Sequence, residues 1–184
     1  MKNRRNQPPR GKPLDAIRVR RRPGTRAQGW LAAGPLHLLV ALGRGGILAN
    51  KREGDGGTPA GRFRPVRLWW RADRAPRPRT FLPVRPIGKN DAWCEDPADR
   101  RYNRPIRIAA AAQGDRLRRA DRLYDYFIEL DHNTRPRVTR RGSAVFIHVA
   151  RPGFAPTAGC VALDQGALRR LLARIGPNTR IAIG

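Results

Sequence analysis

The chain has 184 residues, and 39 lysine or arginine residues against 14 aspartate or glutamate residues give it a formal net charge of +25 at pH 7. This length fits one domain with a sizeable core, and the 19 glycines and 17 prolines favour short elements joined by turns over a helical bundle. The longest apolar run, residues 36–42, is far too short to span a bilayer, and no apolar segment follows the basic N-terminus as a secretory signal requires.

The predicted elements begin with a tail and several strands. Residues 1–13 are basic and contain three prolines, so we expect a disordered tail there and one domain over residues 14–184. Over residues 14–21 apolar and basic side chains alternate, which predicts a strand with one face in water. Residues 29–46 predict two short strands joined by a turn at Gly34–Pro35.

The middle of the chain predicts fewer regular elements. Residues 51–70 begin as a polar, glycine-rich loop, and a strand is expected from Arg62 to Trp70. We expect a basic loop over residues 71–80 and a long irregular segment over residues 81–106. Asp115 is placed to cap one or two helical turns.

The last third of the chain contains the strongest signals. Residues 142–150 are apolar almost throughout, as in a central strand, and residues 163–176 predict the clearest helix, capped by Asp164. A strand before them is predicted by the apolar residues Tyr124, Tyr126, Ile128 and Leu130. The apolar stripe of the helix consists of Leu168, Leu171, Leu172 and Ile175. A last strand follows the helix, so the sequence predicts a mainly β domain with one principal helix.

A cysteine and a histidine are the candidates for chemistry. Cys94 and Cys160 do not make a disulfide framework, and no C-x-x-C pair indicates zinc. Cys160 follows the predicted central strand that ends near His148, and a thiol needs such a base to become a nucleophile. Spacing alone favours another interpretation, in which Cys160 is a small buried hydrophobe and His148 a structural core residue.

The residues around Cys160 suit a nucleophile. Gly159 allows a sharp turn, so that the amides of Gly159 and Cys160 face a substrate oxygen, as in an oxyanion site built from the main chain. The helix predicted after Cys160 would lower the pKa of the thiol through its N-terminal dipole.

Two motifs resemble the catalytic domain of the L,D-transpeptidases, also called the YkuD family. Residues 157–161, TAGCV, are similar to the family signature of serine or threonine, any residue, glycine, cysteine and a hydrophobic residue, with a histidine at a strand end upstream. Residues 58–61, TPAG, match an upstream turn of the family. The similarity covers nearly the full chain, but Ala158 replaces a common histidine and Ala162 a common arginine.

The resemblance implies a β-sandwich or barrel with one principal helix after the catalytic cysteine. It also implies a cysteine acyltransferase that uses no metal or cofactor, in which His148 activates Cys160 and the carbonyl of Val149 orients the imidazole. The implied catalytic residues are Cys160, His148, Gly159 and Val149, and the expected substrate-binding residues are Thr157, Arg151 and Ala158.

The implied substrates are peptidoglycan stem peptides. Cys160 would attack the carbonyl of the third residue of a tetrapeptide, release the terminal D-alanine, and pass the acyl group to an amine of a neighbouring stem. An L,D-carboxypeptidase, an amidase, or attachment of a protein to the wall are alternatives on the same site. We expect carbapenem-type β-lactams to add covalently, the protein to be a monomer without a membrane span, and its place of action to be the cell envelope or periplasm.

The net charge admits a second class of function, a non-catalytic module that binds nucleic acid or another anionic polymer. Arginines are spread along the whole chain, and no recognition helix or zinc finger is evident. A compositional bias toward arginine also explains the charge. We therefore expect no nucleic-acid partner.

Overall fold

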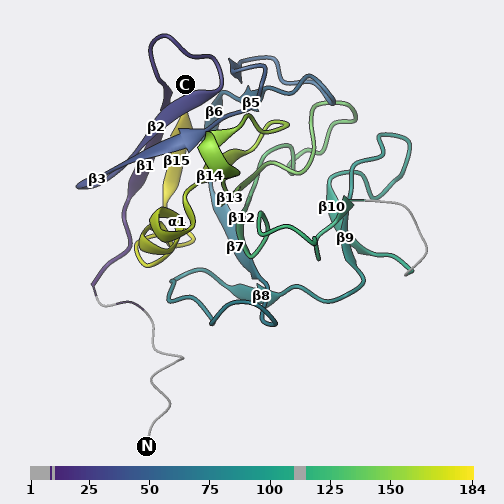
Figure 1. Cartoon of the computed structure of the whole chain (residues 1–184). Helices are drawn as coiled ribbons and strands as arrows, with labels where there is room; N and C mark the ends of the chain where they lie inside the picture. The colour runs from purple at the N-terminus through teal and green to yellow at the C-terminus, as the bar shows by residue number, and fades with distance from the viewer. Residues whose placement is uncertain (1–8, 10, 110–114) are drawn as a thin grey trace, which may run out of the picture.

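The computed structural model describes residue 9 and residues 11–109 and 115–184, and most of the predicted tail over residues 1–13 lies outside this part of the chain. The described residues form a mainly β fold, as predicted, with one α-helix, α1 (Gln165–Leu172), and one short 3-10 helix (Pro152–Phe154) (Figure 1). No helix within the described ranges is long and apolar enough to cross a membrane.

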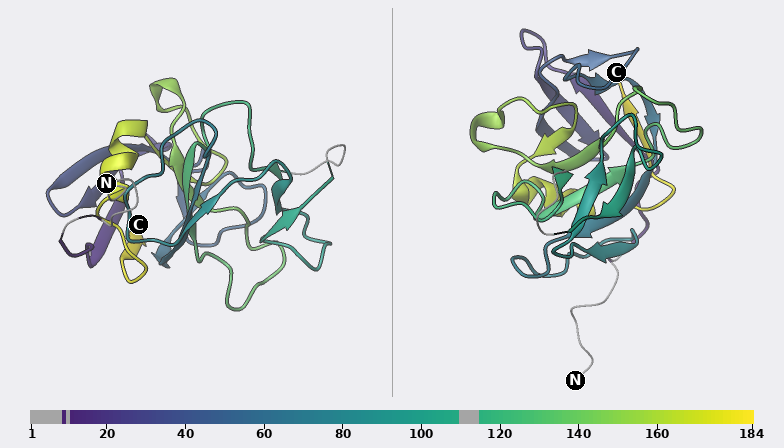
Figure 2. Two further views of the ribbon diagram at one scale, coloured as in Figure 1. Left: turned by 90° about the horizontal axis from the view of Figure 1, so that it is seen from below. Right: turned by 90° about the vertical axis from the view of Figure 1, so that its right-hand side faces the viewer.

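Ten strands form one curled sheet, seen from two further sides in Figure 2. Their order is β6 (Gly61–Phe63), β15 (Arg180–Ile183), β1 (Ala16–Arg21), β2 (Gln28–Ala33), β3 (Leu36–Ala41), β14 (Val161–Leu163), β13 (Phe146–Val149), β12 (Tyr126–Leu130), β7 (Pro65–Trp70) and β8 (Val84–Pro86). A second sheet has the order β10 (Arg104–Arg107), β9 (Asp91–Cys94) and β11 (Asp115–Arg116), and β4 (Ile47–Leu48) pairs with β5 (Thr58–Pro59).

Two hydrophobic clusters cover the two faces of the central strands. On β12, Tyr126 and Ile128 belong to the first cluster, whereas Phe127 belongs to the second. Helix α1 covers the first face, and its predicted stripe residues Leu168, Leu171 and Leu172 are fully buried. The helix is shorter than predicted, because it ends at Leu172, and Ile175 is buried beyond that end. The second face is covered from the small sheet, where Trp93 of β9 meets the ring of Phe146 edge-on at 5.0 Å. The central strands are therefore mostly apolar because both of their faces are covered, and their polar Glu129 and His148 are buried.

Several predicted elements are confirmed. Strand β1 alternates as expected, with Ile17 and Val19 fully buried and Arg18 and Arg20 exposed. Strands β2 and β3 form the hairpin around Gly34–Pro35. The Asp164 side chain caps α1 by accepting a hydrogen bond from the amide of Ala167 at 3.1 Å. Strand β13 is central, between β14 and β12.

The single strand predicted from Arg62 to Trp70 is wrong. The strand is interrupted at Arg64, and the two halves pair with different neighbours. Strand β6 pairs with β15, at one end of the sheet, and β7 pairs with β12, near the other end. Asp131 stabilises this interruption through two hydrogen bonds to the backbone of Arg64. Its carboxylate accepts from the amide of Arg64 at 2.8 Å, and its own amide donates to the Arg64 carbonyl at 3.1 Å. Pro65, which has no amide hydrogen, starts the new strand.

The irregular segment predicted over residues 81–106 is also wrong, because β8, β9 and β10 lie within it. All four residues of β9 are buried, so the strand shows no alternation, and its polar Asp91 is paired with Arg85 at 3.2 Å. Asp115 does not cap a helical turn but lies in β11, opposite Trp93 of β9. Tyr124 precedes β12 and joins the second cluster, not the face of Tyr126.

Candidate active site

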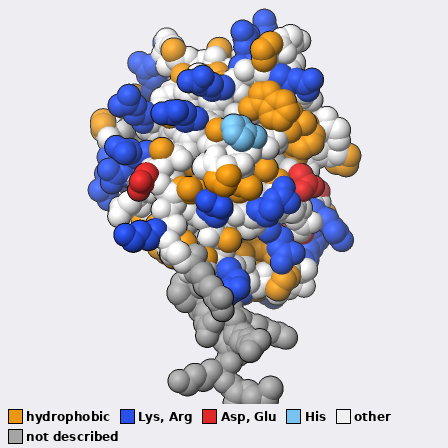
Figure 3. Space-filling model, turned by 90° about the vertical axis from the view of Figure 1, so that its left-hand side faces the viewer, with side chains coloured by type: hydrophobic (Ala, Val, Ile, Leu, Met, Phe, Trp, Pro, Cys, Tyr) orange, Lys and Arg blue, Asp and Glu red, His pale blue; other side chains and the backbone are white. Residues whose placement is uncertain are grey.

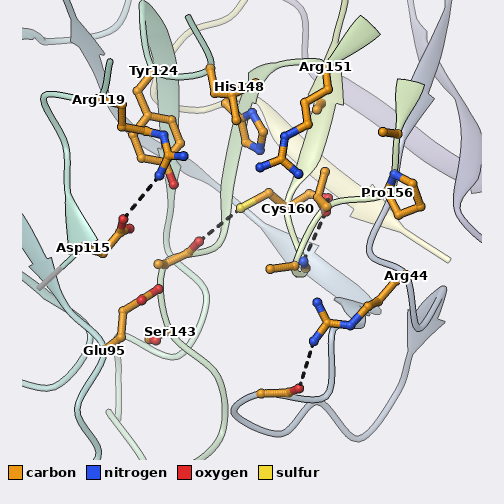
Figure 4. A pocket seen from close by; sticks show the side chains of 18 of the residues that line it. Arg44, Glu95, Asp115, Arg119, Tyr124, Ser143, His148, Arg151, Pro156 and Cys160 are labelled. Atoms are coloured by element: carbon orange, nitrogen blue, oxygen red, sulfur yellow. Dashed lines mark hydrogen bonds and ion pairs between the residues drawn. The ribbon is translucent and has the colours of Figure 1, made fainter. Parts of the chain in front are cut away.

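Two neighbouring parallel strands bring His148 and Cys160 to one pocket. The register of β13 and β14 sets Ile147 opposite Val161 and His148 opposite Ala162, so Cys160 immediately precedes β14. Both side chains line a pocket of about 560 Å³ (Figure 4). The pairing of β13 with β14 thus brings the two residues together, although eleven residues separate them in sequence. It also holds both residues on rigid backbone.

The thiol of Cys160 is held in its neutral form. Its sulfur donates to the carbonyl of Ala144 at 3.2 Å and accepts from the amide of Phe146 at 3.4 Å, and only 9% of the residue is exposed. Burial, with a smaller contribution from the negative charges of Glu95 and Asp115, raises the pKa of Cys160 to about 12.

The expected effect of a helix dipole on Cys160 is not found. Helix α1 begins at Gln165, and β14 separates it from Cys160. Asp164 already accepts a hydrogen bond at the N-terminus of that helix. The pKa of the thiol is raised by burial and not lowered.

His148 is held as a neutral imidazole. Nδ1 lies 2.8 Å from the carbonyl oxygen of Val149, and the ring meets Tyr124 edge-on at 5.6 Å. Since a carbonyl only accepts, this contact assigns the proton to Nδ1 and leaves Nε2 as the acceptor. Burial lowers the pKa of His148 to about 4. At neutral pH the two residues therefore line the pocket as a thiol, bonded to the Ala144 carbonyl, and a free base.

Two threonines fix the loop that carries Cys160. The Thr58 hydroxyl accepts from the amide of Gly43 at 2.8 Å and donates to the carbonyl of Cys160 at 3.3 Å. The Thr157 hydroxyl donates to the same carbonyl at 2.7 Å and accepts from the amide of Gly159 at 3.1 Å. The two motifs noticed in the sequence thus meet at one carbonyl, although 102 positions separate Thr58 from Cys160.

Gly159 occupies a position that a side chain does not fit. Its φ of +147° is rare for residues with a Cβ atom, and a Cβ there would lie 2.8 Å from the carbonyl oxygen of Gly57. The glycine therefore lets the loop before Cys160 pass directly over the loop that precedes Thr58. Its amide is engaged by Thr157 in this structure.

Charges of opposite sign line the two sides of the pocket. Figure 4 shows Glu95 and Asp115 on one side of Cys160, where Arg119 pairs with Asp115 at 3.7 Å, and Arg44 and Arg151 on the other. Trp93 and Glu95 are two positions apart at the end of β9, and Asp115 lies opposite Trp93 on β11, so both carboxylates project from one face of the small sheet. Burial raises the pKa of Glu95 to about 7, and the charge of Asp115 adds to this effect.

Six of the seven predicted site residues line the pocket; Val149 does not, and contributes its carbonyl to His148. Cys94 is buried on β9 and is not part of the lining. Sequence reasoning missed the lining residues Arg44, Glu95, Asp115, Tyr124 and Ser143. No local pattern signalled them, because contacts between distant parts of the chain bring them to the pocket.

Comparison with protein families gives one match. The model of the YkuD family, described as the L,D-transpeptidase catalytic domain, matches residues 21–183, nearly the whole chain. No curated protein and no solved structure matches the chain significantly.

Proposed function

Because the chain belongs to the YkuD family of L,D-transpeptidase catalytic domains, we propose that it transfers acyl groups between peptidoglycan stem peptides through a thioester on Cys160. The observation that carries this proposal is the neutral pair of Cys160 and His148, held on adjacent strands at one pocket. The substrate belongs to the cell envelope, which is where we propose the enzyme acts.

In the first half-reaction, the Cys160 thiol leaves the Ala144 carbonyl and gives its proton to Nε2 of His148, while the sulfur attacks the carbonyl of the third stem residue. With a thiol pKa of about 12, only about one molecule in 10⁵ holds a free thiolate at pH 7, so proton transfer and attack are coupled. A carbon–sulfur bond forms, the bond to the terminal D-alanine breaks, and the proton passes from His148 to the leaving amine.

In the second half-reaction, an amine of a second stem attacks the thioester. The new carbon–nitrogen bond forms as the carbon–sulfur bond breaks, and His148 carries the proton of the amine to the sulfur. We assign the oxyanion of both steps to the amide of Cys160, because the Gly159 amide would first have to leave the Thr157 hydroxyl.

The charges of the pocket support a substrate that carries both carboxylates and amines. Arg44 and Arg151 suit the carboxylates of a stem peptide, because guanidinium groups form charge-assisted hydrogen bonds with them. On the opposite side Glu95 suits an ammonium group, whereas Asp115 is already paired with Arg119. Ala162, opposite His148 in the register, and Ala158 add no charge of their own to this lining. Hydrolysis by water or attachment of a protein amine uses the same thioester and differs only in the acceptor.

The test is incubation with purified tetrapeptide muropeptides, followed by mass analysis of the protein and the products. We expect an acyl adduct that lacks the mass of D-alanine, and crosslinked product, with the native protein and with Cys94→Ala. Cys160→Ala and His148→Gln should give neither, and a carbapenem should add to the first two proteins only. An adduct that persists in Cys160→Ala, or no adduct on the native protein with either reagent, would contradict the proposal.

A further inference from the structure

The outer face of the sheet over β6, β15, β1, β2 and β3 carries positive charge that the catalytic pocket does not use. Residues 16–52 contain eight lysine or arginine residues and no aspartate or glutamate, whereas ten of the 14 acidic residues fall between residues 73 and 131. Figure 3 shows lysine and arginine side chains around hydrophobic ones on this side of the molecule. The five strands themselves thus contain no acidic residue, although Asp15 directly precedes β1.

Strand register arranges the outward side chains in two rows. The second row, on β1, β2 and β3, consists of Arg20, Trp30 and Leu39. The first row crosses all five strands through Arg62, Ala182, Arg18, Ala32 and His37. Because neighbouring strands lie about 4.8 Å apart, this row spans about 19 Å. The small alanines between the longer side chains leave a broad surface and not a groove.

An exposed apolar centre accompanies the charges. Trp30 is 44% exposed, which is unusual for so large an apolar side chain, and Leu39 beside it is half-buried. The guanidinium of Arg22 lies 5.9 Å from the Trp30 ring. Arg18, Arg20 and Arg62 are exposed and form no ion pair with any described residue. Their charges are therefore free to meet anions outside the protein.

We propose that this basic sheet face, defined by Arg18, Arg20, Trp30, His37, Leu39 and Arg62, binds the surface of a bilayer that contains anionic lipids. Indole rings favour the boundary between lipid and water, and arginines favour lipid phosphates. A broad face with an apolar centre matches a lipid surface better than a nucleic-acid strand, which follows a groove. The catalytic pocket is lined by other residues, so this surface is independent of the proposed function.

The test is co-sedimentation of the purified protein with vesicles of phosphatidylcholine, with and without phosphatidylglycerol. We expect binding only when phosphatidylglycerol is present, and weakening by salt. Arg18→Gln with Arg20→Gln should weaken binding by roughly 30-fold, from the attraction expected of two arginines near an anionic surface. The matched control is Arg169→Gln with Arg170→Gln, which removes the same charge from the exposed side of α1 and should change binding much less.

Trp30 provides a second readout. Lipids with brominated acyl chains should quench part of the tryptophan fluorescence of the native protein. Trp30→Phe should remove that part, because Trp69 and Trp93 are buried and the half-buried Trp70 lies on β7, outside the five strands of this face. The proposal is overturned if the native protein does not bind the anionic vesicles, if both arginine pairs weaken binding equally, or if the quenching persists in Trp30→Phe. Tight binding of an oligonucleotide, sensitive to the Arg18 and Arg20 changes, without vesicle binding would assign the face to nucleic acid instead.

Discussion

Replacing Gly159 with alanine tests whether the loop before Cys160 depends on the contact with Gly57. The change adds a Cβ atom 2.8 Å from the Gly57 carbonyl oxygen, at a φ of +147°. Gly153 is the matched control, because its φ of +69° is also positive but nothing lies within 4 Å of an added Cβ. Both variants pay the conformational cost of alanine at positive φ, about 1–2 kcal/mol. Only Gly159→Ala must also displace backbone.

We estimate that displacement at about 1–3 kcal/mol, the usual cost of forcing an extra carbon into a filled site. At about 2–4 °C per kcal/mol for a domain of this size, Gly159→Ala should unfold roughly 2–12 °C below Gly153→Ala. Thermal unfolding followed by circular dichroism measures this difference. Cys160 acylation should also slow in Gly159→Ala only. Equal melting temperatures for the two variants would refute the argument that this close approach defines the loop.

The remaining predictions concern the ionisable groups of the pocket. Since burial lowers the pKa of His148 from 6.5 to about 4, the unfolded state binds more protons between these values, so the contribution of His148 to stability is complete above pH 6.5 and about 3 kcal/mol of it is lost by pH 4. Urea unfolding should therefore show the native protein losing about 3 kcal/mol more than His148→Gln between pH 7 and pH 4, and parallel losses would contradict this. Since Glu95 raises the pKa of Cys160, Glu95→Gln in a Cys94→Ala background should speed alkylation of Cys160 by iodoacetamide at pH 8 a few-fold. Asp96→Asn, next to Glu95 but outside the pocket lining, should leave the rate unchanged, and equal rates in all three proteins would show that Glu95 does not act on the thiol.

The parts of the fold that sequence predicted are those in which each strand or helix has one wet face. In β1 the buried Ile17 and Val19 alternate with arginines, and in α1 the buried residues form one stripe, so the order of apolar and polar residues shows which side is buried. Strand β9 has no such alternation of buried and exposed residues, because it is covered on both faces. The break at Arg64 also left no local signal, since Asp131 fixes it from a distant position.

The candidate site divides in the same way. His148, Cys160 and the loop between them are close in sequence, and their motif was visible. The acidic side of the pocket was not, because Glu95 and Asp115 come together only through the pairing of β9 with β11. The direction of the pKa shift of Cys160 could not be predicted either. A helix was expected directly after Cys160, whereas β14 follows it and the surrounding aromatic rings bury the thiol.

The position of β15 has a consequence for synthesis of the protein. This strand comes last in the chain, yet it lies between β6 and β1, and the amide of Gly184 donates to the carbonyl of Val19 at 3.0 Å. Until residues 180–183 have left the ribosome, β1 and β6 each keep an unpaired edge, which is a site for mispairing with other chains. The sheet is therefore completed only after translation of the domain has finished. Until then the nascent domain remains open and accessible to chaperones.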